Sequence, residues 1–284
     1  MKKGLIMEGG AMRGMFTAGV TDVFMENGIE FDGAVGTSAG AAFGCNYKSR
    51  QIGRALRYNK EYCADERYAS AKGFFRTGNL YSDDFCYHEI PETLDKFDFD
   101  TFNDNPMEFY ITCTNIETGR PVHHRHDENA DDLNTFLEWI RASCAMPMLE
   151  RIVEIGGVKL LDGGVADSVP IRFFEELGFD RNVVILTQPL TYRKKKIKYG
   201  LIARSRYRNY PQLTKAMLDR HIRYNETYDY IREKELKGEL IAVRPPEALN
   251  ISISHDKNEL QRVYDIGRRE GLMSLKKVKD YLGS

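Results

Sequence analysis

The stretch GAVGTSAG, residues 33–40, places one serine among small residues. The apolar residues before it, in IEFDGAV, are typical of a buried strand, and the segment after it, SAGAAFGCNYKS, is typical of a helix. Ser38 therefore lies where a strand bends into a helix. Gly36 and Gly40 flank it in the pattern G-x-S-x-G, in which a tight turn exposes a nucleophilic serine. A flexible glycine-rich loop is the alternative for so short a match.

The rest of the chain continues this alternation. Apolar runs predict buried strands over residues 3–8, 29–35, 108–114, 158–164 and 182–188. Helical spacing of apolar residues predicts helices over residues 15–28, 38–49, 131–144, 170–178 and 258–282. Strands that alternate with helices and are apolar throughout favour an α/β fold, with a mostly parallel central sheet sandwiched by helices in three αβα layers.

The composition is that of an ordinary globular domain, with 42% hydrophobic and 29% charged residues and a net charge of −1. No apolar stretch approaches the roughly 20 residues that span a bilayer. The apolar run after the first lysines is also too short for a secretory signal, so we expect a cytoplasmic protein. The five cysteines include no C-x-x-C pair, which predicts reduced thiols rather than a zinc site or disulfides.

Charge is unevenly distributed along the chain. Residues 83–104 hold eight acidic residues and one lysine, within a segment, 64–106, that breaks the strand–helix alternation and is predicted to be a cap or insertion. Residues 193–223 hold eleven basic residues and one aspartate. Such a basic, tyrosine-containing segment predicts either peripheral contact with an anionic membrane at the inner face or a solvated or oligomer-contacting surface. Nucleic acid is not expected, because the whole chain is not basic. The oligomeric state stays open.

Two more glycine motifs follow predicted strands. GGAMRG, residues 9–14, places backbone N–H groups at a strand-to-helix turn, where they can hold negative charge, although a plain turn also fits. LLDGG, residues 160–164, presents Asp162 at a strand end, although Asp-Gly is also a common turn. Because the carboxyl ends of parallel strands share one edge, we expect both motifs to meet Ser38 there. A nucleophile, an acid and an anion cradle are what acyl transfer needs.

These motifs together resemble those of bacterial patatin-like phospholipases, a family of lipid acyl hydrolases. The resemblance covers about residues 4–190 and rests on EGGAMRG, GTSAG and DGGVADSVP, with TNIETGRPV and IRASCAMPML between them. It implies a catalytic domain over residues 1–190 and a basic, mainly helical region over residues 191–284 that packs on it. Two positions depart from the family pattern: Ala11 replaces a third glycine, and Ser168 stands where asparagine is common.

The resemblance also implies roles for single residues. Ser38 would be the nucleophile and Asp162 its base, in a dyad without histidine that needs no metal or cofactor. An aspartate of ordinary pKa matches a serine proton poorly, so we expect burial to raise the pKa of Asp162. Arg13 would either anchor its loop or meet a lipid phosphate. The oxyanion hole would use backbone N–H groups of Gly9, Gly10, Ala11 and Met12, with support from Arg13, Gly14, Gly36, Gly40, Gly163 and Gly164. The implied substrate is a lipid ester, which makes the protein a phospholipase, lysophospholipase or esterase.

Three alternatives compete with this hypothesis. GGAMRG has the spacing of a dinucleotide-binding loop, but its middle position is Ala11 where glycine is needed. An α/β-hydrolase would need a placed histidine, and no local pattern marks one. The histidines of HHRH, residues 123–126, are predicted to lie in a solvated loop rather than in a metal site. The last alternative is a non-catalytic lipid-binding or adaptor protein that kept the fold.

Overall fold

A twisted central sheet organises the chain. It is seen in a computed structural model that describes residues 1–251 and 253–283. Within these residues the sheet has eight strands in the order β5-β6-β3-β2-β1-β7-β8, and β4 pairs with β3. Strands β1, β2, β3, β7 and β8 are parallel, whereas β4, β5 and β6 are antiparallel to their neighbours. The strands are β1 (Lys2–Met7), β2 (Gly33–Thr37), β3 (Glu108–Asn115), β4 (Pro121–Arg125), β5 (Val153–Ile155), β6 (Val158–Asp162), β7 (Phe179–Ile185) and β8 (Leu240–Val243).

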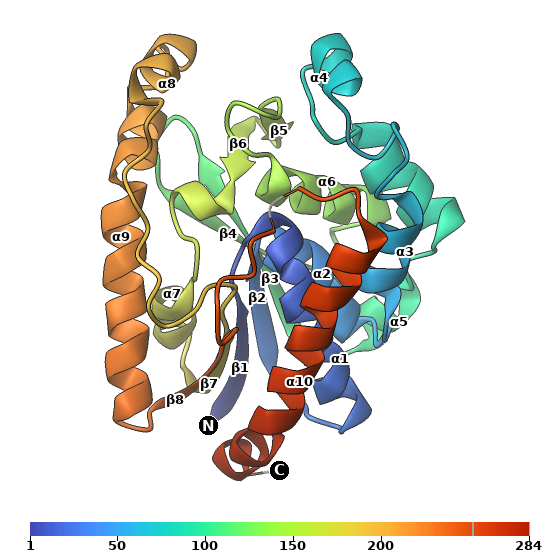
Figure 1. The fold of residues 1–284 in the computed structure, drawn as a ribbon, viewed down its shortest axis with the longest axis vertical. Coiled ribbons are helices and arrows are strands. Elements are labelled where there is room, and N and C mark those ends of the chain that lie inside the picture. The colour runs from blue at the N-terminus through green and yellow to red at the C-terminus, as the bar shows by residue number, and fades with distance from the viewer. Residues whose placement is uncertain (252, 284) are drawn as a thin grey trace.

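Helices cover both faces of the sheet, which confirms the predicted three-layer αβα architecture. Helices α1, α2 and α10 lie on one side and α7 and α9 on the other (Figure 1). The helices are α1 (Gly14–Glu26), α2 (Ala39–Lys48), α3 (Arg54–Tyr62), α4 (Ala71–Thr77), α5 (Phe99–Asp104), α6 (Leu133–Cys144), α7 (Ile171–Glu176), α8 (Gly200–Arg206), α9 (Pro211–Leu236) and α10 (Lys257–Leu282), with the shorter or irregular η1 (Ala11–Arg13), η2 (Phe85–Leu94) and η3 (Gly163–Val165). None of the helices in the described ranges is long and apolar enough to cross a bilayer.

The layers follow from the period of two in a strand, which points successive side chains to opposite faces. In β1, Leu5 and Met7 pack in the cluster formed with α1, α2 and α10. Ile6, between them, packs in a second cluster with residues of α7 and α9. Both faces of the central strands are therefore buried, which is why these strands are apolar throughout.

The long helix α10 packs directly on α1. A β-carbon on Gly19 of α1 would lie 2.2 Å from the carbonyl oxygen of Tyr264, and one on Gly267 of α10 would lie 2.1 Å from that of Phe16. The two backbones therefore approach as closely as paired glycines allow. The Tyr264 hydroxyl also donates to the Asp22 carboxylate, 2.6 Å away. Helix α10 thus completes the core on one face of the sheet.

Two local predictions are wrong. Residues 29–32 are not part of a strand, because β2 begins at Gly33 and the Asp32 carboxylate instead accepts the backbone N–H of Lys3 at 2.7 Å. The HHRH histidines do not lie in a solvated loop. His123 and His124 belong to β4, where His123 stacks on Phe173 and His124 on Trp139, and His126 is buried beside the sheet.

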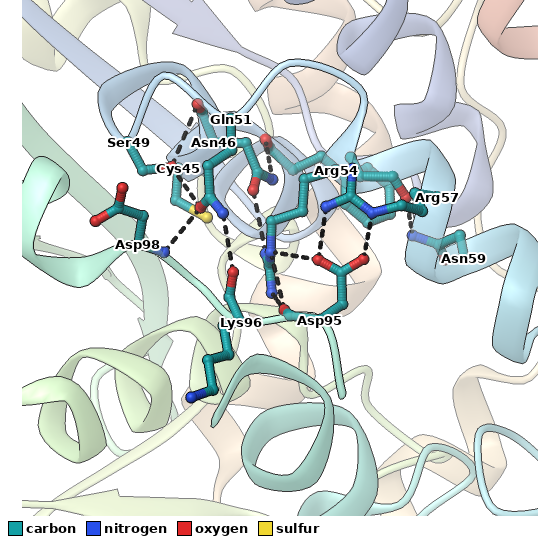
Figure 2. Close-up of polar contacts among 12 residues, drawn as sticks. Cys45, Asn46, Ser49, Gln51, Arg54, Arg57, Asn59, Asp95, Lys96 and Asp98 are labelled. Carbon is teal, nitrogen blue, oxygen red and sulfur yellow. Dashed lines mark hydrogen bonds and ion pairs between the residues drawn. The ribbon is translucent and has the colours of Figure 1, made fainter. Parts of the chain in front are cut away.

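The segment 64–106, which contains α4, η2 and α5, is bound to the first turn of α3 and to the loop before it (Figure 2). Buried Arg54 donates to the side chain of Asn46 at 3.1 Å and, through Nη2, to the carbonyl oxygen of Asp95 at 2.6 Å. Arg57 binds the Asp95 carboxylate with two hydrogen bonds, of 2.6 and 2.8 Å. Gln51 adds bonds to the backbone of residues 96 and 98. These contacts fix the end of the segment against the core.

This network predicts unequal effects for two arginines that share one carboxylate. The Arg54 side chain is 5% exposed and that of Arg57 is 58% exposed. We expect Arg54→Met to lower the free energy of unfolding by about 2–4 kcal/mol, because buried acceptors lose their charged donor. Arg57→Met, the matched control, should cost about 0–1 kcal/mol. Urea unfolding measures both, and equal losses would contradict the assignment.

Candidate active site

Ser38 lies on a sharp bend between β2 and α2. Its backbone has φ 54° and ψ −125°, a conformation that residues other than glycine rarely adopt. The bend forces close contacts on both sides. A β-carbon on Gly40 would lie 2.3 Å from the carbonyl oxygen of Met7, and one on Gly36 would lie 2.4 Å from the backbone nitrogen of Ala41. Neither position has room for a larger residue, so the two glycines permit the bend that presents Ser38.

Asp162 lies next to Ser38, although the two are 124 residues apart in the chain. The Ser38 hydroxyl donates to Asp162 Oδ2 at 2.7 Å, and the other carboxylate oxygen accepts the N–H of Gly164 at 2.7 Å. The Thr114 hydroxyl donates to the carbonyl oxygen of Asp162 at 2.8 Å. These bonds therefore fix both the orientation of the Asp162 carboxylate and the position of its backbone.

The direction of the strand that carries Asp162 differs from the prediction. We expected a carboxyl end in a parallel sheet, but β6 runs antiparallel to β3. Asp162 still reaches Ser38 because it pairs with Cys113, one residue after Thr112, which pairs with Thr37 at the end of β2. The aspartate thus arrives at the same edge of the sheet from the opposite direction.

Burial controls the acidity of Asp162, whose exposed fraction is only 7%. Removal from water raises its pKa above the ordinary value of 3.8. The positive charge of Arg220, the Ser38 hydroxyl, the Gly164 N–H and the charge of Lys194 each lower it, but they do not cancel the effect of burial. The direction agrees with the prediction and moves the carboxylate toward the basicity that accepting a serine proton requires.

Ser143, near the end of α6, holds the bend at Ser38 in place through two hydrogen bonds. Its hydroxyl oxygen accepts the backbone N–H of Ser38 at 2.8 Å and donates to the carbonyl oxygen of Thr112 at 2.6 Å. Sequence reasoning did not single out this residue. The only signal was its place in IRASCAMPML, one of the segments that carried the family resemblance.

The glycine-rich loop after β1 lies against the bend. Gly10 precedes η1, and Ala11 adopts φ 49°, so alanine takes a left-handed conformation that the family pattern gives to glycine. Within residues 1–251 and 253–283, the N–H groups of Gly10 and Ala11 donate to no protein acceptor. The N–H of Gly9 instead donates to the carbonyl oxygen of Ser168, 3.4 Å away. Two free donors therefore line the cavity that contains Ser38.

Glu8 anchors this loop where it leaves β1. It is buried, and it accepts the backbone N–H of Thr187 at 2.6 Å, the Tyr228 hydroxyl at 2.7 Å and the Tyr224 hydroxyl. Both tyrosines belong to α9. Arg13, at the other end of the loop, donates to the carbonyl oxygen of Ile251 at 3.4 Å. The loop is thus held at both ends by the part of the chain after residue 186.

The other predicted motif residues surround the same point. Gly14 begins α1 and packs against Phe43 of α2, and a β-carbon on Gly163 would lie 2.1 Å from the carbonyl oxygen of Thr112. Gly164 supports Asp162 through its N–H. The side chain of Met12 contributes to an apolar cavity beside Ser38.

Two cavities meet at Ser38 and share Ala11 and Met146. The first, of about 230 Å³, has mixed walls, and we call it the polar cavity because Asp162 and three basic residues line it beside apolar residues such as Leu149 and Met217. The second, of about 80 Å³, is apolar, and its walls include Met12, Phe43, Tyr58, Tyr68, Tyr81, Tyr87 and Cys144. A larger cavity of about 650 Å³ is lined by residues 28–32 and 105–108, among others, and includes neither Ser38 nor Asp162. Ser38 therefore lies between a cavity with charged walls and an apolar cavity.

Comparison with known proteins finds a family model and relatives that match this chain. A family model described as patatin-like phospholipase matches residues 5–174, and a domain of unknown function, DUF6363, matches residues 210–283. The uncharacterized protein YjjU of Escherichia coli is 32% identical over 199 residues, which cover 65% of this chain and 52% of YjjU. Lysophospholipase nte1 of Aspergillus terreus is 29% identical over 189 residues, 62% of this chain and 11% of that protein. The match thus spans about half of YjjU and about a tenth of nte1.

Among solved structures, VipD from Legionella pneumophila is similar to this chain. The alignment covers 97% of this chain and 67% of VipD, with a TM-score of 0.46 and 11% sequence identity.

Proposed function

The chain belongs to the patatin-like phospholipase family, and we propose that it hydrolyses fatty-acyl esters of lipids, with Ser38 as nucleophile and Asp162 as base. The observation that carries the proposal is the 2.7 Å hydrogen bond between Ser38 Oγ and a buried carboxylate, beside two N–H groups that have no acceptor among the described residues. The relatives named as lysophospholipases favour the same class of reaction. A lipid-binding protein without catalysis would not need this arrangement.

In the first half of the reaction, Ser38 Oγ attacks the ester carbonyl while its proton passes to Asp162 Oδ2. The carbonyl oxygen becomes negatively charged and accepts hydrogen bonds from the N–H groups of Gly10 and Ala11. Such a donor contributes about 10²–10³-fold to the rate. The tetrahedral intermediate collapses, the alcohol leaves with the proton from Asp162, and the acyl group stays on Ser38.

In the second half, Asp162 accepts a proton from water, which attacks the acyl-serine ester. Collapse of the second tetrahedral intermediate returns the proton to Ser38 Oγ and releases the fatty acid. We assign the oxyanion hole to Gly10 and Ala11 rather than to Gly9, whose N–H is engaged by Ser168. The acyl chain enters the apolar cavity, where aromatic walls such as Phe43 and Tyr87 exclude water.

The surface at the same end of the molecule as Ser38 is suited to contact with lipid. On α8, Leu201 and Ile202 are 82% and 60% exposed, next to the exposed cations Arg204 and Arg206. On α4, Phe75 is 86% exposed. Helices α4 and α8 lie at one end of the molecule and the start of β1 at the other (Figure 1). We propose that residues 193–223 and α4 contact an anionic membrane peripherally and bring the site to its substrate.

Replacement of the nucleophile tests the proposal directly. We expect Ser38→Ala to reduce hydrolysis of p-nitrophenyl acyl esters by at least about 10³-fold, because no other group accepts the acyl chain. The melting temperature should change little, since the backbone and packing are kept. A fluorophosphonate probe should label the wild-type protein at Ser38 only, as mapped by mass spectrometry. Ser49→Ala, at another buried serine, is the control and should keep both activity and labelling. Labelling of a different residue would overturn the assignment.

The base makes activity depend on pH. Asp162 must be ionised to accept the proton, so kcat/KM should rise as pH increases through its pKa. Because burial raises that pKa, the midpoint should lie above the value of about 4 for an ordinary aspartate. Asp162→Asn should remove the activity at every pH. Circular dichroism over the same range controls for unfolding. Substantial turnover by Asp162→Asn would contradict the role of base.

Membrane contact is tested by sedimentation with vesicles. We expect binding to vesicles that contain phosphatidylglycerol, and weaker binding as salt is raised, because the attraction is electrostatic. The double variant Leu201→Ser/Ile202→Ser should bind several-fold less. Leu272→Ser/Met273→Ser, which changes two exposed residues of α10, is the matched control and should bind as the wild type does. Binding that is insensitive to anionic lipid would refute this contact.

A further inference from the structure

Three basic side chains line the polar cavity beside Ser38, and they come from three separate parts of the chain. Arg13 lies in η1, Lys194 in the segment between β7 and α8, and Arg220 on α9. Within the ranges that the structure describes, none of the three forms an ion pair with a carboxylate within 4.0 Å. The cavity therefore concentrates positive charge at the site of the reaction.

The acidic residues of the cavity are already engaged. Glu8 binds two tyrosine hydroxyls and a backbone N–H, and Asp162 binds Ser38 and the N–H of Gly164. Neither carboxylate has an arginine or lysine within ion-pair distance in the described residues. Three cations against two engaged anions leave a cavity suited to a further negative charge.

The two arginines also have unused hydrogen-bonding capacity. The Nε atoms of Arg13 and Arg220 are buried and bind no acceptor among the residues described. The contacts of Arg220 include a long one, 3.5 Å from its Nη2 to the Ser168 hydroxyl. A buried guanidinium with an unused donor is costly, and the charge of an anion in the cavity would offset part of that cost. Guanidinium groups match the oxygen geometry of phosphate.

The side chain of Asn225 holds the backbone of Lys194 in place. Its N–H donates to the Asn225 side chain at 2.9 Å, and the Asn225 amide donates back to its carbonyl oxygen at 3.1 Å. Its ammonium lies 4.3 Å from the centre of the Tyr224 ring. Burial and then the positive charge of Arg220 lower the pKa of Lys194 to about 7. A bound anion would restore its full charge.

We propose that Lys194 and Arg220, together with Arg13, form a subsite for the phosphodiester of a lipid headgroup, so that the enzyme prefers phospholipid or lysophospholipid esters to neutral glycerides. This inference rests on the proposed acyl hydrolysis at Ser38. The ester then lies at Ser38, the acyl chain in the apolar cavity and the phosphate in the polar cavity, which adjoin there. Lys194 and Arg220 lie outside residues 5–174, so the family match does not assign this role to them.

A selectivity measurement separates this role from a mere effect on Asp162. We compare kcat/KM for lysophosphatidylglycerol and for monoacylglycerol with the same acyl chain, both as monomers in solution. Arg220→Gln and Lys194→Met should each lower the ratio of the two values at least tenfold. Lys196→Met and Lys215→Met, at exposed cations of the same region, are matched controls and should leave the ratio unchanged. Equal losses on both substrates would overturn the proposal, because a group that acts on Asp162 alone affects every ester alike.

A binding measurement keeps the test independent of turnover. Ser38→Ala protein is titrated with glycerophosphoglycerol, the headgroup diester without an acyl chain, and separately with inorganic phosphate. We expect the diester to bind and Arg220→Gln in the same background to remove most of that binding. Binding of inorganic phosphate without the diester would overturn the headgroup assignment in favour of free phosphate. Diester binding by a protein whose wild type hydrolyses neither ester would support the subsite while refuting the proposed function.

Discussion

The close contact between the start of α2 and the end of β1 is the constraint on which the site depends. Gly40 lies against the carbonyl oxygen of Met7 with no space for a β-carbon, and Gly36 lies equally close to α2. The chain can make this contact only by taking Ser38 through an unusual backbone conformation. That conformation projects the hydroxyl from the edge of the sheet, where Asp162 of β6 and the backbone N–H groups of the loop after β1 also lie. Packing between a strand and a helix thus sets the geometry of the site.

Much of this could be predicted from local sequence. Apolar runs and helical spacing gave the alternation of strands and helices, and three glycine motifs indicated which strand ends meet. The direction of β6 could not be predicted, because it is set by pairing with β3 across a long stretch of intervening chain. The packing of His123 and His124 depends in the same way on partners, Phe173 and Trp139, that are distant or unmarked in the sequence.

The residues that support the site could not be predicted from the sequence for a related reason. Glu8 acts through contacts with α9, and Ser143 acts through contacts with the Ser38 backbone and β3. The residues near them in the sequence do not predict these contacts. Lys194 stands in a run of basic residues that all look alike as sequence. Only the fold distinguishes Lys194, which lines the cavity, from the exposed Lys196 two positions later. A site that is recognisable from its motifs is therefore completed by residues that are not.

The anchoring of Glu8 has a consequence for synthesis of the protein. Its tyrosine partners follow it by 216 and 220 residues, so they leave the ribosome long after β1 does. Until then the carboxylate has no hydroxyls to bind, and burying it at the end of β1 is unfavourable. The loop after β1 therefore lacks its buried anchor until α9 has been made. Translation therefore cannot complete the surroundings of Ser38 before Tyr224 and Tyr228 have been synthesised.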